Sequence, residues 1–188
     1  MNLKSTALIV IDMQNDFVGR EAVIPCSCTE NLIQNIKTLI GFCHDNQVPV
    51  IYTREEHRSN RIDFGRELDA EEPLHCLEGS SGAEIIEELK PAETDYVILK
   101  RRYSGFFQTD LQLLLSGLKV DTLIITGAAT DVCVRATATD AQQYGYYVYV
   151  PQDCAAGTNP KQHAAALEHI RYILGKVVML SDILSQAG

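Results

Sequence analysis

Three reactive side chains stand at the carboxyl ends of short apolar runs: the carboxylate of Asp12, the ammonium of Lys100 and the thiol of Cys133. Cys133 lies six residues beyond Gly127, in a turn of small residues that leads into a helical pattern. Because the carboxyl ends of parallel strands meet at one edge of a sheet, we expect these side chains to converge there. The spacing therefore predicts one site that contains a thiol, a carboxylate and an ammonium.

Such a site suits nucleophilic catalysis. A thiol at a helix N-terminus beside a lysine has a depressed pKa and is a strong nucleophile. A nearby carboxylate accepts the thiol proton and returns it to a leaving nitrogen, and backbone N–H groups of the turn bind a developing oxyanion. Taken singly, the same residues suit plainer roles, with Asp12 as a strand-end cap, Lys100 as a solvated charge and Cys133 as a core filler. Their joint position at strand ends favours the catalytic interpretation.

The elements that must position these residues follow from the alternation of apolar runs with amphipathic segments. Runs in which the odd and the even positions are both apolar are typical of strands covered on both faces, as in parallel sheets. The alternation predicts one domain, residues 1–188, with a Rossmann-like three-layer α/β/α sandwich around a mostly parallel six-stranded sheet. The expected strands cover residues 7–11, 48–52, 96–99, 122–125, 146–150 and 177–179, and the expected helices cover 30–44, 83–89, 109–118, 132–144, 160–174 and a last one from 181.

The composition is that of an ordinary globular chain. Its 188 residues are 46% apolar and 22% charged, and the apolar run at 7–11 is too short for a membrane span or a signal peptide core. We therefore expect a soluble, cytoplasmic protein with reduced cysteines, and no membrane partner. The formal net charge of −9 disfavours nucleic acid as a partner, because an acidic chain repels phosphate backbones. A small molecule is the expected partner.

Three segments resemble motifs of the isochorismatase-like cysteine hydrolases, a family with nicotinamidase and N-carbamoylsarcosine amidohydrolase branches. Residues 7–17, which contain Val-Ile-Asp-Met-Gln-Asn-Asp-Phe, resemble the opening of that family. Residues 100–106 resemble its lysine segment, and residues 127–134 resemble its nucleophile turn. The resemblance extends over nearly the whole chain in order and spacing, and it implies the isochorismatase-like hydrolase fold.

Within this resemblance the three strand-end residues acquire roles. It implies that Asp12 is the general base, Lys100 the electrostatic partner and Cys133 the nucleophile. It also implies a cis peptide bond between Ala128 and Ala129, with the backbone N–H groups of Ala129 and Cys133 as the oxyanion hole.

The presence of Cys133 points to acyl chemistry, because members of the family that cleave the vinyl ether of isochorismate need not keep the cysteine. We expect a hydrolase that cleaves a non-peptide carbon–nitrogen bond of a small amide, carbamoyl or ureido compound through a thioester. The alternatives are a metal-dependent nicotinamidase and, from another class, a catalytically silent interaction protein on the same scaffold. The resemblance also implies a homo-oligomer, a dimer or a tetramer.

The one irregular segment, residues 54–82, is rich in charge, glycine and histidine, and a loop of that length is typically functional. His57 and His75 resemble the histidines that bind a divalent ion in the nicotinamidase branch. Glu55 stands where that branch has an aspartate, and Asp63 falls near the place of another histidine. Glu55, His57 and His75 could form an open site for an ion such as zinc. Other branches work without metal, so we expect no required cofactor, and the alternative is that these residues pair with loop arginines.

Candidates for substrate binding are aromatic or basic. Tyr103 and Phe106 follow Lys100 closely and could wall an apolar pocket over the thiol, with Phe17 from the first motif. Arg66 could hold a substrate carboxylate, since a guanidinium matches it bidentately. The alternatives are a core role for the aromatic side chains and a solvent-facing arginine.

Overall fold

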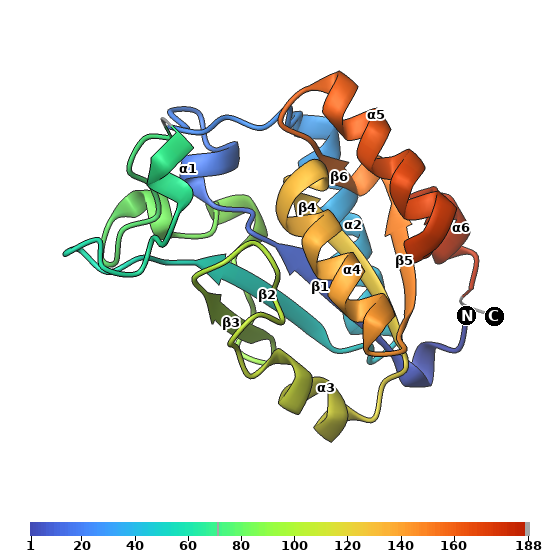
Figure 1. Cartoon of the computed structure of the whole chain (residues 1–188). Helices are drawn as coiled ribbons and strands as arrows, with labels where there is room; N and C mark the ends of the chain where they lie inside the picture. The colour runs from blue at the N-terminus through green and yellow to red at the C-terminus, as the bar shows by residue number, and fades with distance from the viewer. Residues whose placement is uncertain (71, 187–188) are drawn as a thin grey trace.

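The chain forms a parallel sheet with helices on both faces (Figure 1). The structure, a computed structural model, describes residues 1–70 and 72–186. Six strands follow the order β3-β2-β1-β4-β5-β7, and a short strand, β6, pairs with β4. The layered parallel architecture is confirmed, but the sheet has seven strands instead of six because β6 adds a two-residue pairing. The strands are β1 (Thr6–Ile11), β2 (Val50–Glu55), β3 (Tyr96–Lys100), β4 (Thr122–Ala128), β5 (Tyr147–Pro151), β6 (Ala155–Ala156) and β7 (Lys176–Val178).

The strand order reverses direction between β1 and β4. From β1 the chain moves outward through β2 to β3, returns to β4 and continues to the opposite edge through β5 and β7. In sheets of this kind, ligands bind outside the carboxyl ends of the strands where the order reverses. Ile11 of β1 pairs with Gly127 of β4 at that point, so the binding crevice is expected beside Asp12 and the turn after β4.

Helices on both faces explain why the strands are apolar on both sides. α3, α4 and α5 pack on one face through residues such as Leu115, Ala138 and Leu167. α2 and α6 pack on the other through residues such as Ile36 and Ile183, and β1 between the layers is buried at every position. The helices are α1 (Asn15–Val18), α2 (Glu30–Asp45), α3 (Leu111–Leu118), α4 (Arg135–Gln143), α5 (Pro160–His169) and α6 (Leu180–Leu184).

Side-chain caps determine where two of the longer helices begin. At α2, the Thr29 side chain accepts a hydrogen bond from the Leu32 N–H, and at α5 the Asn159 side chain accepts one from Gln162 N–H. The helix expected at 160–174 is present over that length, although its final turn is π-helical.

Residues 83–89 fold differently from the expected helix. Two short 3-10 turns, Ser81–Ala83 and Glu87–Leu89, flank an extended Ile86. The Ile86 N–H donates to the Met13 carbonyl at 2.9 Å, and its side chain is buried. A short isolated helix is marginal, so these tertiary contacts outweigh the helical pattern.

The second strand ends later than its apolar run predicts. β2 continues to Glu55 because Arg54 and Glu55 pair with Leu99 and Lys100 of β3. Glu55 was expected in a loop, but the ladder makes it the last residue of a strand beside Lys100. This extension brings a second carboxylate to the carboxyl edge of the sheet.

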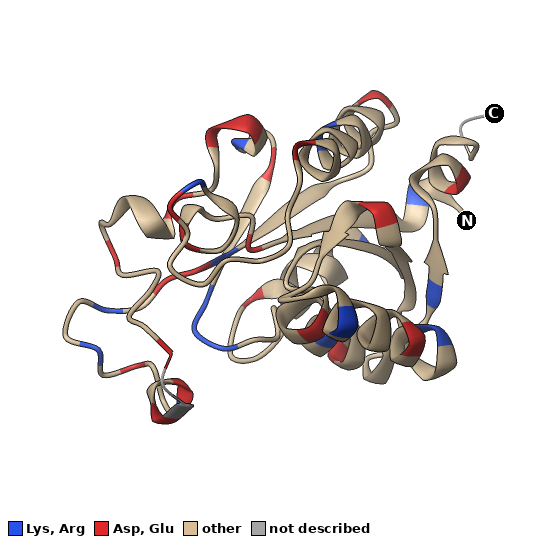
Figure 2. Cartoon of the chain, turned by 90° about the horizontal axis from the view of Figure 1, so that it is seen from above, with Lys and Arg blue, Asp and Glu red and all other residues tan. Residues whose placement is uncertain are grey.

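The surface carries most of the charge. Figure 2 shows acidic and basic residues mainly on helices and loops, while most of the sheet consists of uncharged residues, which are drawn in tan.

Within residues 1–70 and 72–186, no helix is both long and apolar enough to cross a membrane. All six cysteines are free thiols in the structure. The homo-oligomeric state stays a prediction.

At the end of β4, Gly127 combines a positive φ with a close approach of the neighbouring backbone. Its φ is +105°, and a Cβ at this position would lie 2.1 Å from the Ile11 carbonyl oxygen. We predict that Gly127→Ala lowers the free energy of unfolding by about 3 kcal/mol or more, because backbone strain and a backbone clash act together. Urea denaturation followed by circular dichroism measures this change.

Gly41→Ala is the matched control. Gly41 lies within α2, and a Cβ there would meet open space. Alanine should raise the free energy of unfolding by about 0.5–1 kcal/mol, since glycine is a poor helix former. Equal stabilities for the two alanine variants would contradict the account of the β4 end.

Candidate active site

The strand ends bring the three sequence candidates together. Asp12 follows β1, Lys100 ends β3, and Cys133 lies in a π-helical turn, Thr130–Val134, just after β4. Lys100 Nζ lies 2.8 Å from Asp12 Oδ2 and 3.6 Å from Cys133 Sγ. Glu55, at the end of β2, joins them, with its Oε2 at 2.5 Å from Lys100 Nζ. The site thus contains the expected convergence and one additional carboxylate.

Lys100 is completely buried, which excludes the solvated charge considered from the sequence. A buried ammonium needs anionic partners, because removing an unpaired ion from water costs several kcal/mol. Burial alone would lower the pKa of Lys100, but Asp12, Cys133 and Glu55 outweigh it and hold the pKa well above the usual range. The lysine therefore stays protonated among its acidic neighbours.

Asp12 is also buried and is held from a second side by Thr53. The Thr53 hydroxyl donates to Asp12 Oδ1 at 2.6 Å, and Asp12 has the left-handed backbone conformation, with φ of +44°. Burial raises the pKa of Asp12 above its ordinary value, and Glu55 adds to this rise, while Lys100 opposes it. A carboxyl group with a raised pKa is well suited to take up and release a proton.

The thiol of Cys133 differs from the sequence expectation. Burial raises its pKa well above the ordinary value, Lys100 opposes this rise, and the Asp12 and Glu55 carboxylates add to it. The expected depression of the pKa is therefore wrong, because the sequence pattern showed the lysine and the helix end but not the depth of burial or Glu55. The resting sulfur carries its proton, so a base must remove it during attack.

The turn that carries Cys133 also brings backbone groups to the site. The peptide bond between Ala128 and Ala129 is cis, the form that the family resemblance implies. Ala128, Ala129 and Cys133 line the same cavity. The role of the Ala129 and Cys133 N–H groups as an oxyanion hole stays a prediction.

A cavity of about 70 Å³ lies beside Cys133. Phe17 and Tyr103, two substrate-binding candidates from the sequence, line it together with Ile24 and Val132. Apolar walls beside the charged group suit the apolar part of a small organic ligand whose reactive end faces the sulfur.

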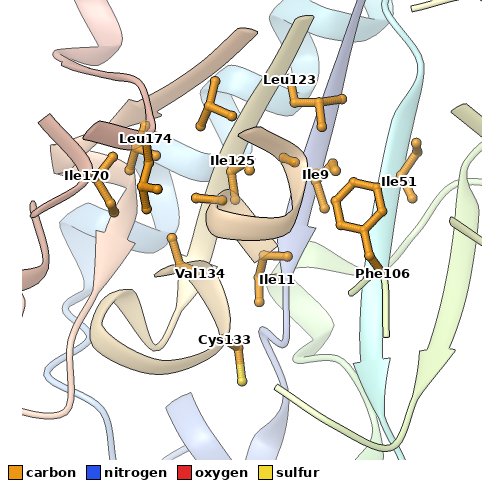
Figure 3. Close-up of a cluster of buried hydrophobic side chains, with 14 of the residues drawn as sticks. Ile9, Ile11, Ile51, Phe106, Leu123, Ile125, Cys133, Val134, Ile170 and Leu174 are labelled. Carbon is orange, nitrogen blue, oxygen red and sulfur yellow. The ribbon is translucent and has the colours of Figure 1, made fainter. Parts of the chain in front are cut away.

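Two other candidates lie elsewhere. Phe106 belongs to the hydrophobic core, where Figure 3 shows its ring beside Ile9 and Ile51, with Cys133 at the margin of the same cluster. The Arg66 side chain is 94% exposed and pairs with Asp69 at 2.8 Å. The structure therefore contradicts a role for Phe106 or Arg66 in this cavity, because core packing withdraws one and an exposed ion pair holds the other in solvent.

A second group of ionisable side chains adjoins the first through Glu55. Glu55, His57, Glu67 and His75 are buried, and one potential ligand atom of each lies within 4.8 Å of the others. Glu55 Oε1 is 3.0 Å from His75 Nε2 and 3.4 Å from His57 Nε2. Among the described residues, both ring nitrogens of His57 and Oε2 of Glu67 have no hydrogen-bond partner. Buried donor atoms without partners fit a divalent metal ion.

Both histidines present Nε2 to this group. His75 Nδ1 lies 2.9 Å from the Pro73 carbonyl oxygen, and His57 Nδ1 lies 3.5 Å from Asp63 Oδ1. An acceptor beside Nδ1 favours the tautomer with the proton there, which leaves the Nε2 lone pair for a metal. The His57 ring also stacks on Phe64, with centroids 3.8 Å apart. The expected set Glu55, His57 and His75 is therefore assembled, with Asp63 positioned behind His57.

The charges of the metal-free group balance locally. Burial would raise the pKa of Glu55, but Lys100 and the two histidines outweigh it and hold the pKa well below the ordinary value. Burial would lower the pKa of His75, but its contacts with Glu55 and the Pro73 carbonyl raise it to about 9. A metal ion would therefore have to replace the proton of His75.

Sequence reasoning missed Gln14, which fixes the end of β2. Its Nε2 donates to the carbonyl oxygens of Glu55 and Ala83 at 2.7 and 2.8 Å, and its Oε1 accepts from the Glu55 N–H at 2.8 Å. A glutamine two residues after a strand-end aspartate is the signal that could have marked it. Glu67 was missed as well, and its charged surroundings in the sequence offered no such signal.

Comparisons with known proteins identify the family of the chain. Residues 6–182 match the family model described as the isochorismatase domain. The chain is 33% identical over 173 residues to nicotinamidase 3 of Arabidopsis thaliana, covering 91% of this chain and 83% of that protein. It is 30% identical over 199 residues to the ureidoacrylate amidohydrolase RutB of Enterobacter sp. (strain 638), covering 94% and 86%.

A solved structure extends the likeness to three dimensions. The chain resembles the pyrazinamidase of Pyrococcus horikoshii in complex with zinc, with a TM-score of 0.85 and 34% identity over 93% of this chain and 99% of that one. Fold and sequence matches together identify a hydrolase. The chain belongs to the isochorismatase family.

We predict that Gln14→Met lowers the free energy of unfolding by about 2–4 kcal/mol, because the buried N–H and C=O groups of Glu55 lose their partners. Gln34→Met, on the exposed side of α2, is the matched control and should change it by no more than about 0.5 kcal/mol. Urea denaturation of both variants gives the comparison. Equal stabilities would show that Gln14 does not hold the β2 end.

Proposed function

We propose that the protein is a cysteine-dependent amidohydrolase that cleaves a carbon–nitrogen bond of a small amide, carbamoyl or ureido compound through a thioester. The observation that carries this proposal is one buried ammonium in contact with both a carboxylate and a thiol, at 2.8 Å from Asp12 Oδ2 and 3.6 Å from Cys133 Sγ. A base and a nucleophile beside a cavity meet the geometric requirements of covalent catalysis.

In the first half of the reaction Asp12 acts as the general base. Its carboxylate lies close enough to the thiol to raise the thiol pKa, and its own raised pKa suits a group that must later give the proton away. Lys100 stabilises the thiolate as the proton leaves. Sγ attacks the carbonyl carbon, and the N–H groups of Ala129 and Cys133 stabilise the resulting oxyanion.

In the second half Asp12 returns the proton. The tetrahedral intermediate collapses, the carbon–nitrogen bond breaks, and the nitrogen takes the proton from Asp12 and leaves as ammonia or an amine. The acyl group remains on Cys133 as a thioester. Asp12 then deprotonates a water molecule that attacks the thioester, and collapse of the second intermediate releases the acid or carbamate and restores the thiol.

We also propose that Glu55, His57 and His75 hold a divalent ion next to this machinery. The support is the close approach of their ligand atoms, the His57 ring nitrogens that lack hydrogen-bond partners among the described residues, and the tautomers favoured by Asp63 and the Pro73 carbonyl. A bound ion would supply Lewis acidity beside the substrate cavity. Glu55 would serve both groups, since its Oε2 contacts Lys100 and its Oε1 faces the histidines.

A metal-dependent nicotinamidase is the second candidate function. The observation that favours it is the histidine and carboxylate group itself, because a nicotinamidase and a zinc-bound pyrazinamidase are among the similar proteins. The aromatic side chains of Phe17 and Tyr103 in the cavity wall also suit contact with a small aromatic carboxamide. Hydrolysis of nicotinamide that is lost on chelation would favour this candidate.

We predict that Cys133→Ala lowers the rate of ammonia release by about 1000-fold or more, because the nucleophile is lost while the fold keeps a small side chain. The assay covers carboxamides, ureides and carbamoyl amino acids. Cys28→Ala, a half-buried cysteine outside this cavity, is the matched control and should keep the activity.

Unchanged activity of Cys133→Ala would contradict the proposed mechanism. A wild-type protein that is folded but inactive across the whole panel would instead support the interaction protein considered as the non-enzymatic alternative.

We further predict that the protein binds one zinc ion per chain and that His57→Asn weakens this binding at least about 100-fold, since a directly bound imidazole is lost. Equilibrium dialysis with elemental analysis measures both quantities. His169→Asn, an exposed histidine on α5, should leave the affinity unchanged. Equal affinities of the two variants would remove His57 from the metal site.

A further inference from the structure

Glu67 is a buried carboxylate for which the proposed reaction has no use. It begins the 3-10 helix Glu67–Ala70, in the segment that follows β2, and its side chain is only 5% exposed. In the part of the chain that the structure describes, its Oε2 has no hydrogen-bond partner. An unpaired buried carboxylate oxygen is unfavourable, because nothing replaces the water that it loses.

The atoms around Glu67 Oε2 are donor atoms of the histidine group. Glu67 Oε2 lies 3.6 Å from His57 Nε2. Glu55 Oε1 lies 3.4 Å from the same His57 Nε2 and 3.0 Å from His75 Nε2. Ligands bound about 2.0–2.2 Å from a tetrahedral zinc ion lie about 3.3–3.6 Å from one another. The separations of 3.4 and 3.6 Å around His57 Nε2 fall within this range, and the 3.0 Å between Glu55 Oε1 and His75 Nε2, which is a hydrogen bond in the metal-free group, is shorter.

We propose that Glu67 is a fourth protein ligand of a divalent metal ion bound with Glu55, His57 and His75, an inference that rests on the proposed metal site. With both histidines neutral, the two carboxylates balance the charge of one divalent cation. Imidazole and carboxylate ligands together suit zinc. The same ion satisfies His57 Nε2 and Glu67 Oε2, two buried atoms that have no hydrogen-bond partner among the residues that the structure describes.

An ion pair between Glu67 and a protonated His57 explains the geometry less well. The separation of 3.6 Å is long for a charge-assisted hydrogen bond, and both ring nitrogens of His57 lack hydrogen-bond partners within the described residues. Asp63 Oδ1 faces Nδ1 at 3.5 Å, but a protonated ring would also bury an N–H at Nε2 that makes no hydrogen bond to any described residue, which is costly. A neutral ring needs an acceptor at only one nitrogen, and the metal takes the other.

Ligation by Glu67 would connect the metal to the substrate cavity. Glu67 and Tyr103 both line that cavity, and burial together with the Glu67 and Glu72 carboxylates raises the pKa of Tyr103. A metal bound to Glu67 would fix the segment after β2 against the strand end. Metal occupancy would then set the position of one cavity wall.

The Zn²⁺ affinity of the whole protein, measured by competition with a chromophoric chelator, tests this role. Glu67→Gln should weaken Zn²⁺ binding about tenfold or more, because a neutral amide oxygen replaces an anionic ligand. Glu72→Gln is the matched control, since Glu72 lines the same cavity but is exposed and lies outside the ligand group. It should bind Zn²⁺ as tightly as the unchanged protein.

The absorption spectrum of bound Co²⁺ supplies a second readout, because it responds to the ligand set and not to catalysis. We expect Glu67→Gln and Glu67→Ala to change this spectrum and Glu72→Gln to preserve it, with circular dichroism confirming the fold of each variant.

An unchanged Zn²⁺ affinity and Co²⁺ spectrum in both Glu67 variants would overturn the role of Glu67 and leave the three-residue site standing. A wild-type protein that binds no Zn²⁺ would overturn both metal assignments. Neither result contradicts the proposed catalytic role of Cys133, which the ammonia-release assay tests separately.

Discussion

The site depends on the buried positive charge of Lys100. Its ammonium has no exposure to solvent and is shared by Asp12, Glu55 and Cys133, which come from three other parts of the chain. Each carboxylate would be strongly disfavoured at this depth without a cation beside it. One charge therefore makes it favourable to gather a base and a nucleophile where the strand order reverses. The interaction that stabilises the sheet edge is also the one that prepares the chemistry.

Glu55 connects this charge to the neighbouring histidine group. One carboxylate oxygen contacts Lys100 and the other faces His75 and His57, so the two groups share a single side chain. An aspartate at this position, one methylene shorter, would not span the same distance from the backbone. The position of Glu55 is in turn fixed by the β2–β3 ladder and by the side chain of Gln14. A change in either group is therefore expected to affect the other.

The layered fold and the convergence of Asp12, Lys100 and Cys133 could be predicted from the sequence, because strand periodicity determines which ends share an edge. The protonation of Cys133 could not, since it depends on burial and on Glu55, which the apolar run placed in a loop. Phe106 was assigned from its nearness to Lys100 along the chain and Arg66 from the chemistry of its guanidinium, whereas packing decides which side chains reach a cavity. Glu67 lies in a charged segment without periodicity, so only the folded chain shows that it meets His57.

Trapping by hydroxylamine shows whether turnover passes through a covalent intermediate on Cys133. A thioester on Cys133 partitions between water and hydroxylamine, so a turned-over amide should yield a hydroxamate in addition to the acid. We expect hydroxamate in proportion to the hydroxylamine present and none from the Cys133→Ala variant. Amide turnover that gives only the free acid at high hydroxylamine would contradict a reaction through the sulfur.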